Sequence, residues 1–415
     1  MVSYSLNKPA PKSTIRKILG KSIIFVVGLL IFFAALEFLT RHYCPSHLSA
    51  FFAAYDLKPG LPYLSFGNEE QQVDFAQKAK TINELGFQSA KEIPIEKGEN
   101  TYRIFFLGGS VAKSGGYDIP PERRYYALLE QKLNAAFPSM KFECISAGVE
   151  SYVSNQELVW FIFSRIAEMS PDIIIMFDGY NDIAFPINFW SQVGYPYNYN
   201  HKNKLFSSPW YYFIGKSANH SVLLNYYYNY LIKKEIDRGR QKFLNDSEAT
   251  NNLALNYTAN MEKIASLLCA YQPQAKMFVT LQPIISHKQK LTNREQEVLY
   301  KDFVVADYVK KAYPVFIQHL NKSAILKEKD VTIADITDTF ADYADDVYRD
   351  TSHLSQDGHG SRILAERFYE ILRPVIYTQL NPDLFKAQEP QVKEVTPGKI
   401  KKESSLSPVD VKTRE

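Results

Sequence analysis

Short apolar runs alternate with longer stretches of helical periodicity from residue 101 onward. The first run, residues 102–107, ends in two glycines and has the continuous hydrophobicity of a buried parallel strand. Similar runs at residues 142–146, 173–177, 276–281 and 331–336 predict four more strands. The stretches between them predict helices that begin near residue 121 and cover residues 155–168, 250–271, 293–320 and 357–379. This alternation predicts an α/β domain with a central parallel five-stranded sheet.

The most hydrophobic segment lies near the N-terminus. Residues 22–36 contain no charged side chain. A helix over residues 18–39 would reach roughly 33 Å, enough to cross a bilayer core of about 30 Å. The first 21 residues carry five lysines and arginines and no acid. This basic flank predicts that residues 1–21 stay in the cytoplasm, that residues 22–40 span the membrane, and that the remaining chain is extracytoplasmic, in the periplasm or at the cell surface.

Two other interpretations of this segment compete with a membrane anchor. A cleaved signal peptide would have a shorter apolar core followed by small residues at the cleavage site. Ala34 and Ala35 fit that pattern poorly, because one charged and two bulky residues follow them closely. A buried helix of a soluble protein is the third possibility.

Composition and breaks in the pattern divide the rest of the chain. Apolar residues make up 46% of the sequence, so we expect a packed core, and a net charge of +3 does not indicate nucleic-acid binding. Residues 41–100, interrupted by prolines, are predicted to form a stalk and lead-in to a globular domain at residues 101–380. Residues 386–415 have no aromatic side chain and are predicted to be a disordered tail.

An insertion rich in aromatic side chains, residues 184–249, interrupts the alternation of strands and helices. It leaves the domain shortly after the third predicted strand, so we expect it to cover the carboxyl edge of the sheet. Its tyrosines and tryptophans could form a packed cap, or they could present rings on which sugars stack.

Glycine-rich and polar motifs follow the predicted strands. Ser110, Gly148 and Asn181 come just after the first, second and third strands. Asp350 and His353 lie in the loop between the fifth strand and the final helix. Because the carboxyl ends of parallel strands meet at one edge of a sheet, we expect all five residues at that edge.

These residue types are the ones that acyl transfer needs. A serine hydroxyl becomes a nucleophile when a histidine takes its proton, and a carboxylate fixes the histidine tautomer. The spacing of Asp350 and His353 lets the carboxylate reach Nδ1 and leaves Nε2 for Ser110. The backbone N–H groups of Ser110 and Gly148 and the amide of Asn181 could form an oxyanion hole. Glycine at position 148 would let a substrate oxygen approach the backbone.

Together these motifs resemble the conserved blocks of the SGNH hydrolase superfamily, also called GDSL esterases and lipases. The blocks supply serine, glycine, asparagine and histidine in this order, with an aspartate three residues before the histidine. Ser110, Gly148, Asn181, Asp350 and His353 match them in order. The resemblance covers roughly residues 101–378 apart from the insertion, and it implies a flavodoxin-like α/β/α three-layer sandwich.

The first block departs from the usual pattern of the superfamily. It is usually Gly-Asp-Ser, and here it is Gly108-Gly109-Ser110. In this respect the chain resembles the membrane-anchored bacterial branch, which also has an Asp-Gly-Tyr-Asn-Asp third block. The aspartate after the asparagine, Asp182 here, is expected to stabilise the turn by hydrogen bonds.

The resemblance implies a carboxylic ester hydrolase that works through Ser110, His353 and Asp350. The wider superfamily includes carbohydrate esterases, so the implied substrate is an acylated small molecule or an O-acetylated extracytoplasmic glycan. The same triad could instead serve an acetyltransferase, and a non-catalytic glycan-binding or assembly protein is the alternative from another class. No cofactor and no metal ion are expected, because His359 lacks cysteine or carboxylate partners at ligand spacing.

Overall fold

The computed structural model describes residues 12–43, 87, 93–115, 119–189, 191–197, 199–218 and 220–381. The predicted tail and most of the predicted lead-in lie outside the described residues. The chain divides into two units, Met1–Tyr369 and Glu370–Glu415, and the sheet belongs to the first. Of the second unit, the structure describes the end of the last helix and one residue beyond it.

Five parallel strands form the central sheet in the order β2-β1-β3-β4-β5. They are β1 (Thr101–Leu107), β2 (Lys141–Ser146), β3 (Ile173–Asp178), β4 (Lys276–Leu281) and β5 (Thr332–Ala334). This is the strand order of flavodoxin-like folds, in which successive strands are added on one side of β1 and then, from β3 onward, on the other side. The predicted α/β class and the five-stranded parallel sheet are therefore confirmed.

Helices precede, connect and follow these strands. They are α1 (Lys12–Tyr43), α4 (Ser110–Ser114), α5 (Tyr125–Ala136), α6 (Ser154–Phe163), α7 (Tyr180–Asn188), α8 (Tyr199–Ser207), α9 (Pro209–Ala218), α10 (Val222–Leu244), α11 (Ala249–Tyr271), α12 (Asn293–Lys301), α13 (Phe303–Lys322), α14 (Ala324–Glu328) and α15 (His359–Leu380). Short 3₁₀ turns occur at Pro121–Arg123, Ile166–Met169 and Ile285–His287.

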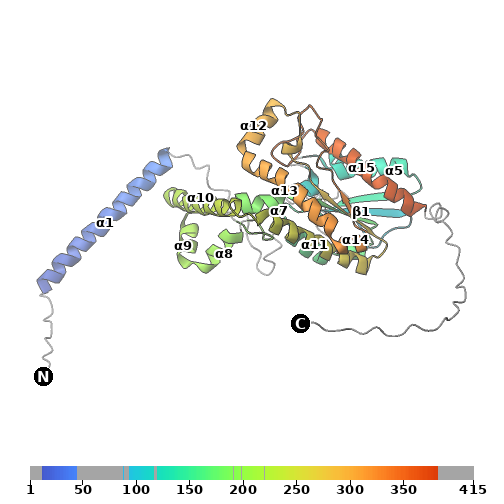
Figure 1. Cartoon of the computed structure of the whole chain (residues 1–415). Coiled ribbons are helices and arrows are strands. Elements are labelled where there is room, and N and C mark those ends of the chain that lie inside the picture. Colours follow the sequence, from blue (N-terminus) through green and yellow to red (C-terminus); the bar gives the residue numbers. More distant parts are fainter. Residues whose placement is uncertain are drawn as a thin grey trace, which may run out of the picture. The chain divides into compact units, whose positions relative to one another are not determined.

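The helices cover both faces of the sheet and give three layers (Figure 1). On one face, Phe106 of β1 and Phe177 of β3 contact Tyr125 of α5 and Phe368 of α15, with ring centroids 5.1–5.7 Å apart. Neighbouring strand residues point the other way. Phe105 accordingly belongs to the larger core cluster, which includes residues of α6, α11 and α13. The three-layer α/β/α sandwich is confirmed.

Three elements differ from the sequence prediction. The helix predicted over residues 155–168 ends at Phe163, because Arg165 has φ 62° and leaves the helical conformation. The single helix predicted over residues 293–320 is divided at Asp302, whose backbone has φ −128° and ψ 29° and leaves the helical conformation. The Asp302 carboxylate instead accepts hydrogen bonds from Thr351 and Asn188. β5 is shorter than predicted, because the side chain of Asp335 accepts hydrogen bonds from the N–H and Oγ1 of Thr337 and begins a turn.

The aromatic insertion is helical and has a small core of its own. This core is formed by Tyr211, Ile214, Ala218, Tyr228 and Ile232, which lie on α9 and α10. Part of the insertion therefore packs as a cap would. α10 also reaches the body of the domain, since Arg240 donates to the carbonyl of Ile187 and to the side chain of Asn188, both on α7.

The N-terminal helix α1 contains a segment, Leu19–Tyr43, that is long and apolar enough to cross a membrane. None of its most apolar window is buried against the rest of the described chain. A signal sequence near an N-terminus has the same length and composition. The structure is thus compatible with the predicted anchor and gives no orientation for it.

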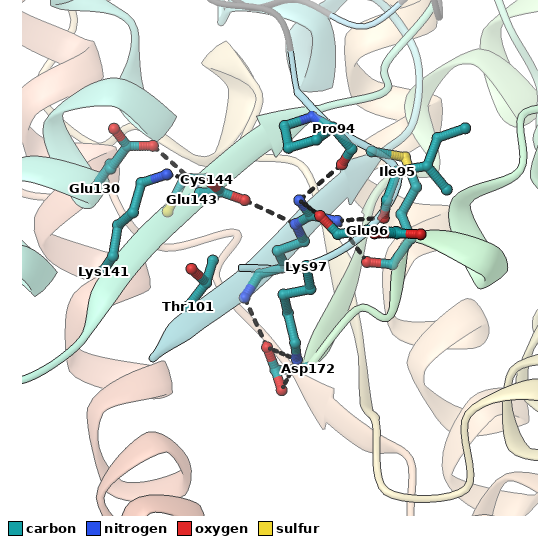
Figure 2. A network of polar contacts seen from close by, with 12 residues as sticks. Pro94, Ile95, Glu96, Lys97, Thr101, Glu130, Lys141, Glu143, Cys144 and Asp172 are labelled. Atoms are coloured by element: carbon teal, nitrogen blue, oxygen red, sulfur yellow. Dashed lines mark hydrogen bonds and ion pairs between the residues drawn. The ribbon is translucent and has the colours of Figure 1, made fainter. Parts of the chain in front are cut away.

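A buried arginine organises the edge of the sheet where the strands begin. The side chain of Arg103 on β1 is fully buried. Its guanidinium donates to Glu143 on β2 at 2.7 Å and to backbone carbonyl oxygens. These carbonyls belong to Pro94, Ile95, Glu96 and Met169. Asp172 adds a carboxylate that accepts from the N–H of Arg103 and from the Lys97 ammonium, as Figure 2 shows. The network fixes residues 94–97 against the first three strands.

Candidate active site

Ser110 and His353 meet at the carboxyl edge of the sheet although they lie 243 residues apart in the chain. β1 ends at Leu107, two glycines follow, and Ser110 begins the short helix α4. His353 lies in the loop before α15. The distance from its Nε2 to the Oγ of Ser110 is 2.6 Å. A hydrogen bond of this length lets the imidazole accept the serine proton.

Asp350 holds the other side of the imidazole. The Nδ1 of His353 lies 2.9 Å from Oδ1 and 2.8 Å from Oδ2 of Asp350. Oδ1 also accepts the backbone N–H groups of Ser352 and His353 at 3.0 and 2.9 Å. Partial burial raises the pKa of the Asp350 carboxyl, but these hydrogen bonds and the charge of the imidazolium outweigh it, so the pKa is lowered. An ionised Asp350 requires the proton on Nδ1, which leaves the Nε2 lone pair for Ser110.

A buried ion pair fixes the loop that leads to Asp350. The carboxylate of Glu295 on α12 pairs with the ammonium of Lys288, and neither side chain is exposed. The same carboxylate accepts the backbone N–H groups of Val347 at 2.9 Å and Tyr348 at 3.1 Å. Sequence reasoning missed this support. Its one local sign was the Thr292-x-x-Glu295 capping box at the start of α12, which does not indicate that Glu295 reaches a loop 52 residues later.

Asn181 lies beside the residue that precedes Ser110. Its Nδ2 donates to the carbonyl of Tyr152 at 2.8 Å, so one amide hydrogen is used within the protein and the second is available. A Cβ at Gly109 would lie 2.5 Å from this Nδ2. Glycine at position 109 thus leaves room for the Asn181 amide.

Gly148 is packed against the helix that Ser110 begins. A Cβ at this position would lie 2.3 Å from the backbone nitrogen of Lys113, inside α4. The need for glycine therefore comes from the close approach of α4, a different reason from the substrate access expected from the sequence. The N–H of Gly148 forms a long hydrogen bond of 3.3 Å to the Oγ of Ser146. The N–H of Ser110 opens α4 and so has no acceptor within that helix.

The structure thus gathers all five residues singled out in the sequence. Ser110, His353 and Asp350 form one hydrogen-bonded chain. Gly148 and Asn181 are placed against residues on either side of Ser110. Among the described residues, no group of three or more histidine, cysteine, aspartate or glutamate side chains could hold a metal ion.

A second group of carboxylates lies buried behind this edge. Asp178 is the last residue of β3, Asp182 lies on α7, and Glu157 lies on α6; all three are at most 2% exposed. Asp182 accepts from the N–H and Oγ of Ser154 at 3.0 and 2.5 Å, and Asp178 accepts from the hydroxyl of Tyr257. The hydrogen bonds expected of Asp182 are therefore present. No N–H or O–H group of the described residues donates to either oxygen of Glu157.

These buried carboxyls are held partly protonated. Burial raises the pKa of Asp182 to about 7, with a further contribution from the charge of Asp178, against the opposing effect of Ser154. Burial and the charges of Asp178 and Asp182 raise the pKa of Glu157 well above its usual value. Glu157 and Asp178 interact carboxyl to carboxyl. Such a contact is favourable only when at least one of the two carries a proton.

Comparison with known proteins finds similarity in structure alone. No protein-family model matches the sequence. No curated protein matches it. Among solved structures, the chain is similar to an acetyl xylan esterase, AlAXEase, at 14% identity and a TM-score of 0.36, with 65% of this chain and 99% of that chain covered.

Two further solved structures give similar values. TesA is 12% identical, with 66% of this chain and 98% of that chain covered and a TM-score of 0.36. A putative GDSL-like lipase from Parabacteroides merdae is 9% identical, with 68% and 98% covered and a TM-score of 0.36.

Proposed function

We propose that the protein is a serine esterase of the SGNH type, anchored in a membrane by α1 and acting on carboxylic esters outside the cytoplasm. The observation that carries the proposal is the chain of hydrogen bonds from Asp350 through His353 to Ser110, with 2.6 Å between Nε2 and Oγ. A serine without a catalytic role needs no histidine beside its hydroxyl, and a histidine without such a role needs no carboxylate at its Nδ1.

The reaction follows from these positions. His353 takes the proton of Ser110 while Oγ attacks the ester carbonyl, and the oxyanion accepts hydrogen bonds from the amide of Asn181 and the N–H groups of Ser110 and Gly148. His353 then gives its proton to the alcohol oxygen, the bond from that oxygen to the acyl carbon breaks, and an acyl-enzyme remains. Water, deprotonated by the same imidazole, releases the acid and restores Ser110. Asp350 stabilises the imidazolium throughout.

The substrate we propose is an O-acyl group, O-acetyl in particular, on an extracytoplasmic glycan. The support is the membrane-spanning length of α1 together with the aromatic residues of the insertion. Transfer of the acyl group to a sugar hydroxyl instead of water would use the same residues, so product analysis with an added oligosaccharide acceptor distinguishes the two reactions.

The proposal is tested with p-nitrophenyl acetate and the full chain in detergent. In Ser110→Ala we expect the turnover number to fall by about 10⁶-fold, the loss typical of a missing serine nucleophile. A fluorophosphonate probe should label the wild type and not this variant. The matched control is Ser266→Ala, which removes an exposed serine hydroxyl of α11 that bonds only to its own helix. Equal rates for wild type and Ser110→Ala would refute the proposal.

A further inference from the structure

Large aromatic side chains stand exposed on the first two helices of the insertion, and three of them are more than half exposed. Phe206 on α8 and Trp210 and Phe213 on α9 are 74%, 69% and 61% exposed. They are spaced four and three residues apart, and the rings of Trp210 and Phe213 stack with centroids 6.1 Å apart. We call these three residues the aromatic patch. Contiguous exposed apolar side chains mark surfaces that bind a protein, a ligand or a membrane.

The small core of the insertion does not need this patch. The opposite side of α9 carries Tyr211, Ile214 and Ala218, which pack against α10 and are buried. α8 continues into α9 with little break, because the N–H of Ser208 donates to the carbonyl of Lys204 and its own carbonyl accepts the N–H of Tyr212. The two helices therefore form one amphipathic segment with a filled inner side and an aromatic outer side.

The start of α10, which follows this segment, bonds to α1 near the end of its apolar run. The carboxylate of Glu37 accepts hydrogen bonds from the Oγ of Ser221 at 2.8 Å and from the N–H groups of Val222 and Leu223 at 2.9 and 3.0 Å. It thus satisfies the first N–H groups of α10. Arg41, one turn later on α1, donates to the carbonyl of His220 at 3.0 Å.

These contacts set where the aromatic patch lies relative to the end of α1. Glu37 lies in the last turn of the predicted span of residues 22–40, so in an α1 that spans a bilayer it lies near the membrane surface. α9 ends at Ala218, two residues before His220, and its ten residues measure about 15 Å. Trp210 and Phe213 are therefore within one short helix of that surface.

The charge of this region also favours a membrane surface as the partner of the aromatic patch. Residues 183–234 contain five lysines and no aspartate or glutamate. Lys216 lies over the ring of Tyr212 on the exposed side of α9. Lys204 of α8, by contrast, pairs with Glu235 of α10. Tryptophan and phenylalanine beside an exposed lysine, on helices that contain no aspartate or glutamate of their own, is the composition of helices that lie in the interface of an anionic bilayer.

We propose that α8 and α9 form a second membrane contact, with the aromatic patch inserted among the lipid headgroups beside the outer end of α1. This inference rests on the anchor of the proposed function. The inference adds a role for α10, which bonds to α1 at its first turn and to α7 near its last turn. Because α7 carries Asn181, α10 connects the membrane contact to the candidate active site. The domain is then held against the membrane through two separate contacts.

The test measures the environment of Trp210 in the full chain. The protein is reconstituted into vesicles of phosphatidylcholine and phosphatidylglycerol, with or without acyl-chain bromination of the phosphatidylcholine. The contribution of Trp210 is the difference in fluorescence between the wild type and Trp210→Phe. We expect brominated lipid to reduce this contribution at least about two-fold and aqueous iodide to quench it weakly. The matched control is Trp210→Phe/Tyr271→Trp, which places the reporter at an exposed site on α11, where iodide and not bromolipid should quench.

The outcomes separate the two proposals. If alkaline carbonate releases the chain from the vesicles, both the anchor and the second contact are wrong. If the chain is retained and iodide quenches Trp210 as strongly as the α11 reporter, the second contact alone is wrong. Shielding of Trp210 from both quenchers would show that protein covers it, and protection by a soluble oligosaccharide instead of lipid would show a sugar platform; each would overturn the membrane contact.

Discussion

The two edges of the sheet treat buried polar groups in opposite ways. Where the strands begin, the guanidinium of Arg103 has a carboxylate and four carbonyl oxygens as acceptors, and Asp172 has two donors (Figure 2). Where the strands end, Glu157 has no donor among the described residues, and its pKa is raised. Buried polar groups with complete partners stabilise a fold, whereas perturbed ones gather at sites that carry chemistry.

The carboxyl edge itself holds two kinds of carboxylate. Asp350 is 46% exposed and meets an imidazole and two backbone N–H groups, and its pKa is lowered. Asp182 is buried beside another carboxyl, and its pKa is raised to about 7. The same side chain is therefore charged in one place and partly neutral in the other, because its partners differ.

Among the carboxylates, the largest expected effect on turnover comes from replacing Asp350, which is charged. In Asp350→Asn the amide cannot stabilise the imidazolium and favours the wrong tautomer, so we expect the turnover number to fall by about 10⁴-fold with little change in unfolding free energy. Steady-state kinetics with p-nitrophenyl acetate measure this. Asp338→Asn, a change on an exposed aspartate paired with Arg367, is the control. A fall of less than about ten-fold would contradict the role assigned to Asp350.

A substitution at the edge where the strands begin should lower the unfolding free energy and leave the turnover number unchanged. In Arg103→Met the carbonyls of the 94–96 segment and of Met169 lose their donor, and we expect about 3–5 kcal/mol less unfolding free energy, because one partner of a buried network is removed. Chemical unfolding in detergent measures it. Arg238→Met removes an exposed pair with Glu235 and should change stability by at most about 1 kcal/mol. A folded Arg103→Met with a much reduced turnover number would break the distinction between the two edges.

Asn181 tests the oxyanion site separately from the nucleophile. In Asn181→Ala we expect the turnover number to fall by about 10²–10³-fold while fluorophosphonate still labels Ser110, because the hydroxyl and its base are unchanged. Asn245→Ala, at the exposed end of α10, is the control. Loss of labelling together with turnover would mean that Asn181 holds the shape of the site, not the oxyanion.

The smallest expected effect is on the unfolding free energy that depends on the buried carboxyls, and it changes with pH. Their folded pKa values are raised, so between about pH 4 and pH 7 the folded state holds protons that the unfolded state has released, and stability falls as the pH rises through that window. Glu157→Gln removes one of these groups with a raised pKa and puts a neutral amide in its place. We expect its melting temperature to fall less than that of the wild type between pH 5 and pH 7, with a gain of about 1–2 kcal/mol at neutral pH.

The test compares how the melting temperatures of three proteins depend on pH. Thermal unfolding of the wild type, of Glu157→Gln and of the surface variant Glu168→Gln is followed from pH 5 to pH 8. The surface variant should keep the pH dependence of the wild type, since Glu168 is 54% exposed and pairs with Arg165 at the surface. Parallel pH profiles for all three proteins would show that Glu157 is ionised in the folded protein.

The sequence by itself determined the parallel sheet and the edge at which the candidate residues lie. Apolar runs of strand length between helical stretches leave few topologies, and residues that follow successive strands must emerge at one edge. The spacing of Asp350 and His353 likewise brought a carboxylate within reach of Nδ1 without any long-range information. The catalytic roles of these residues stay a prediction.

Tertiary structure alone decided the features that depend on distant segments. The approach of α4 explains why position 148 is glycine, and the approach of the Asn181 side chain explains why position 109 is glycine. The protonation of the buried carboxyls depends on which groups from α6, β3 and α7 are enclosed together. The exposure of Trp210 depends on which side of α9 faces α10. Local patterns are set by periodicity, whereas desolvation and close approach are set by neighbours far away in the chain.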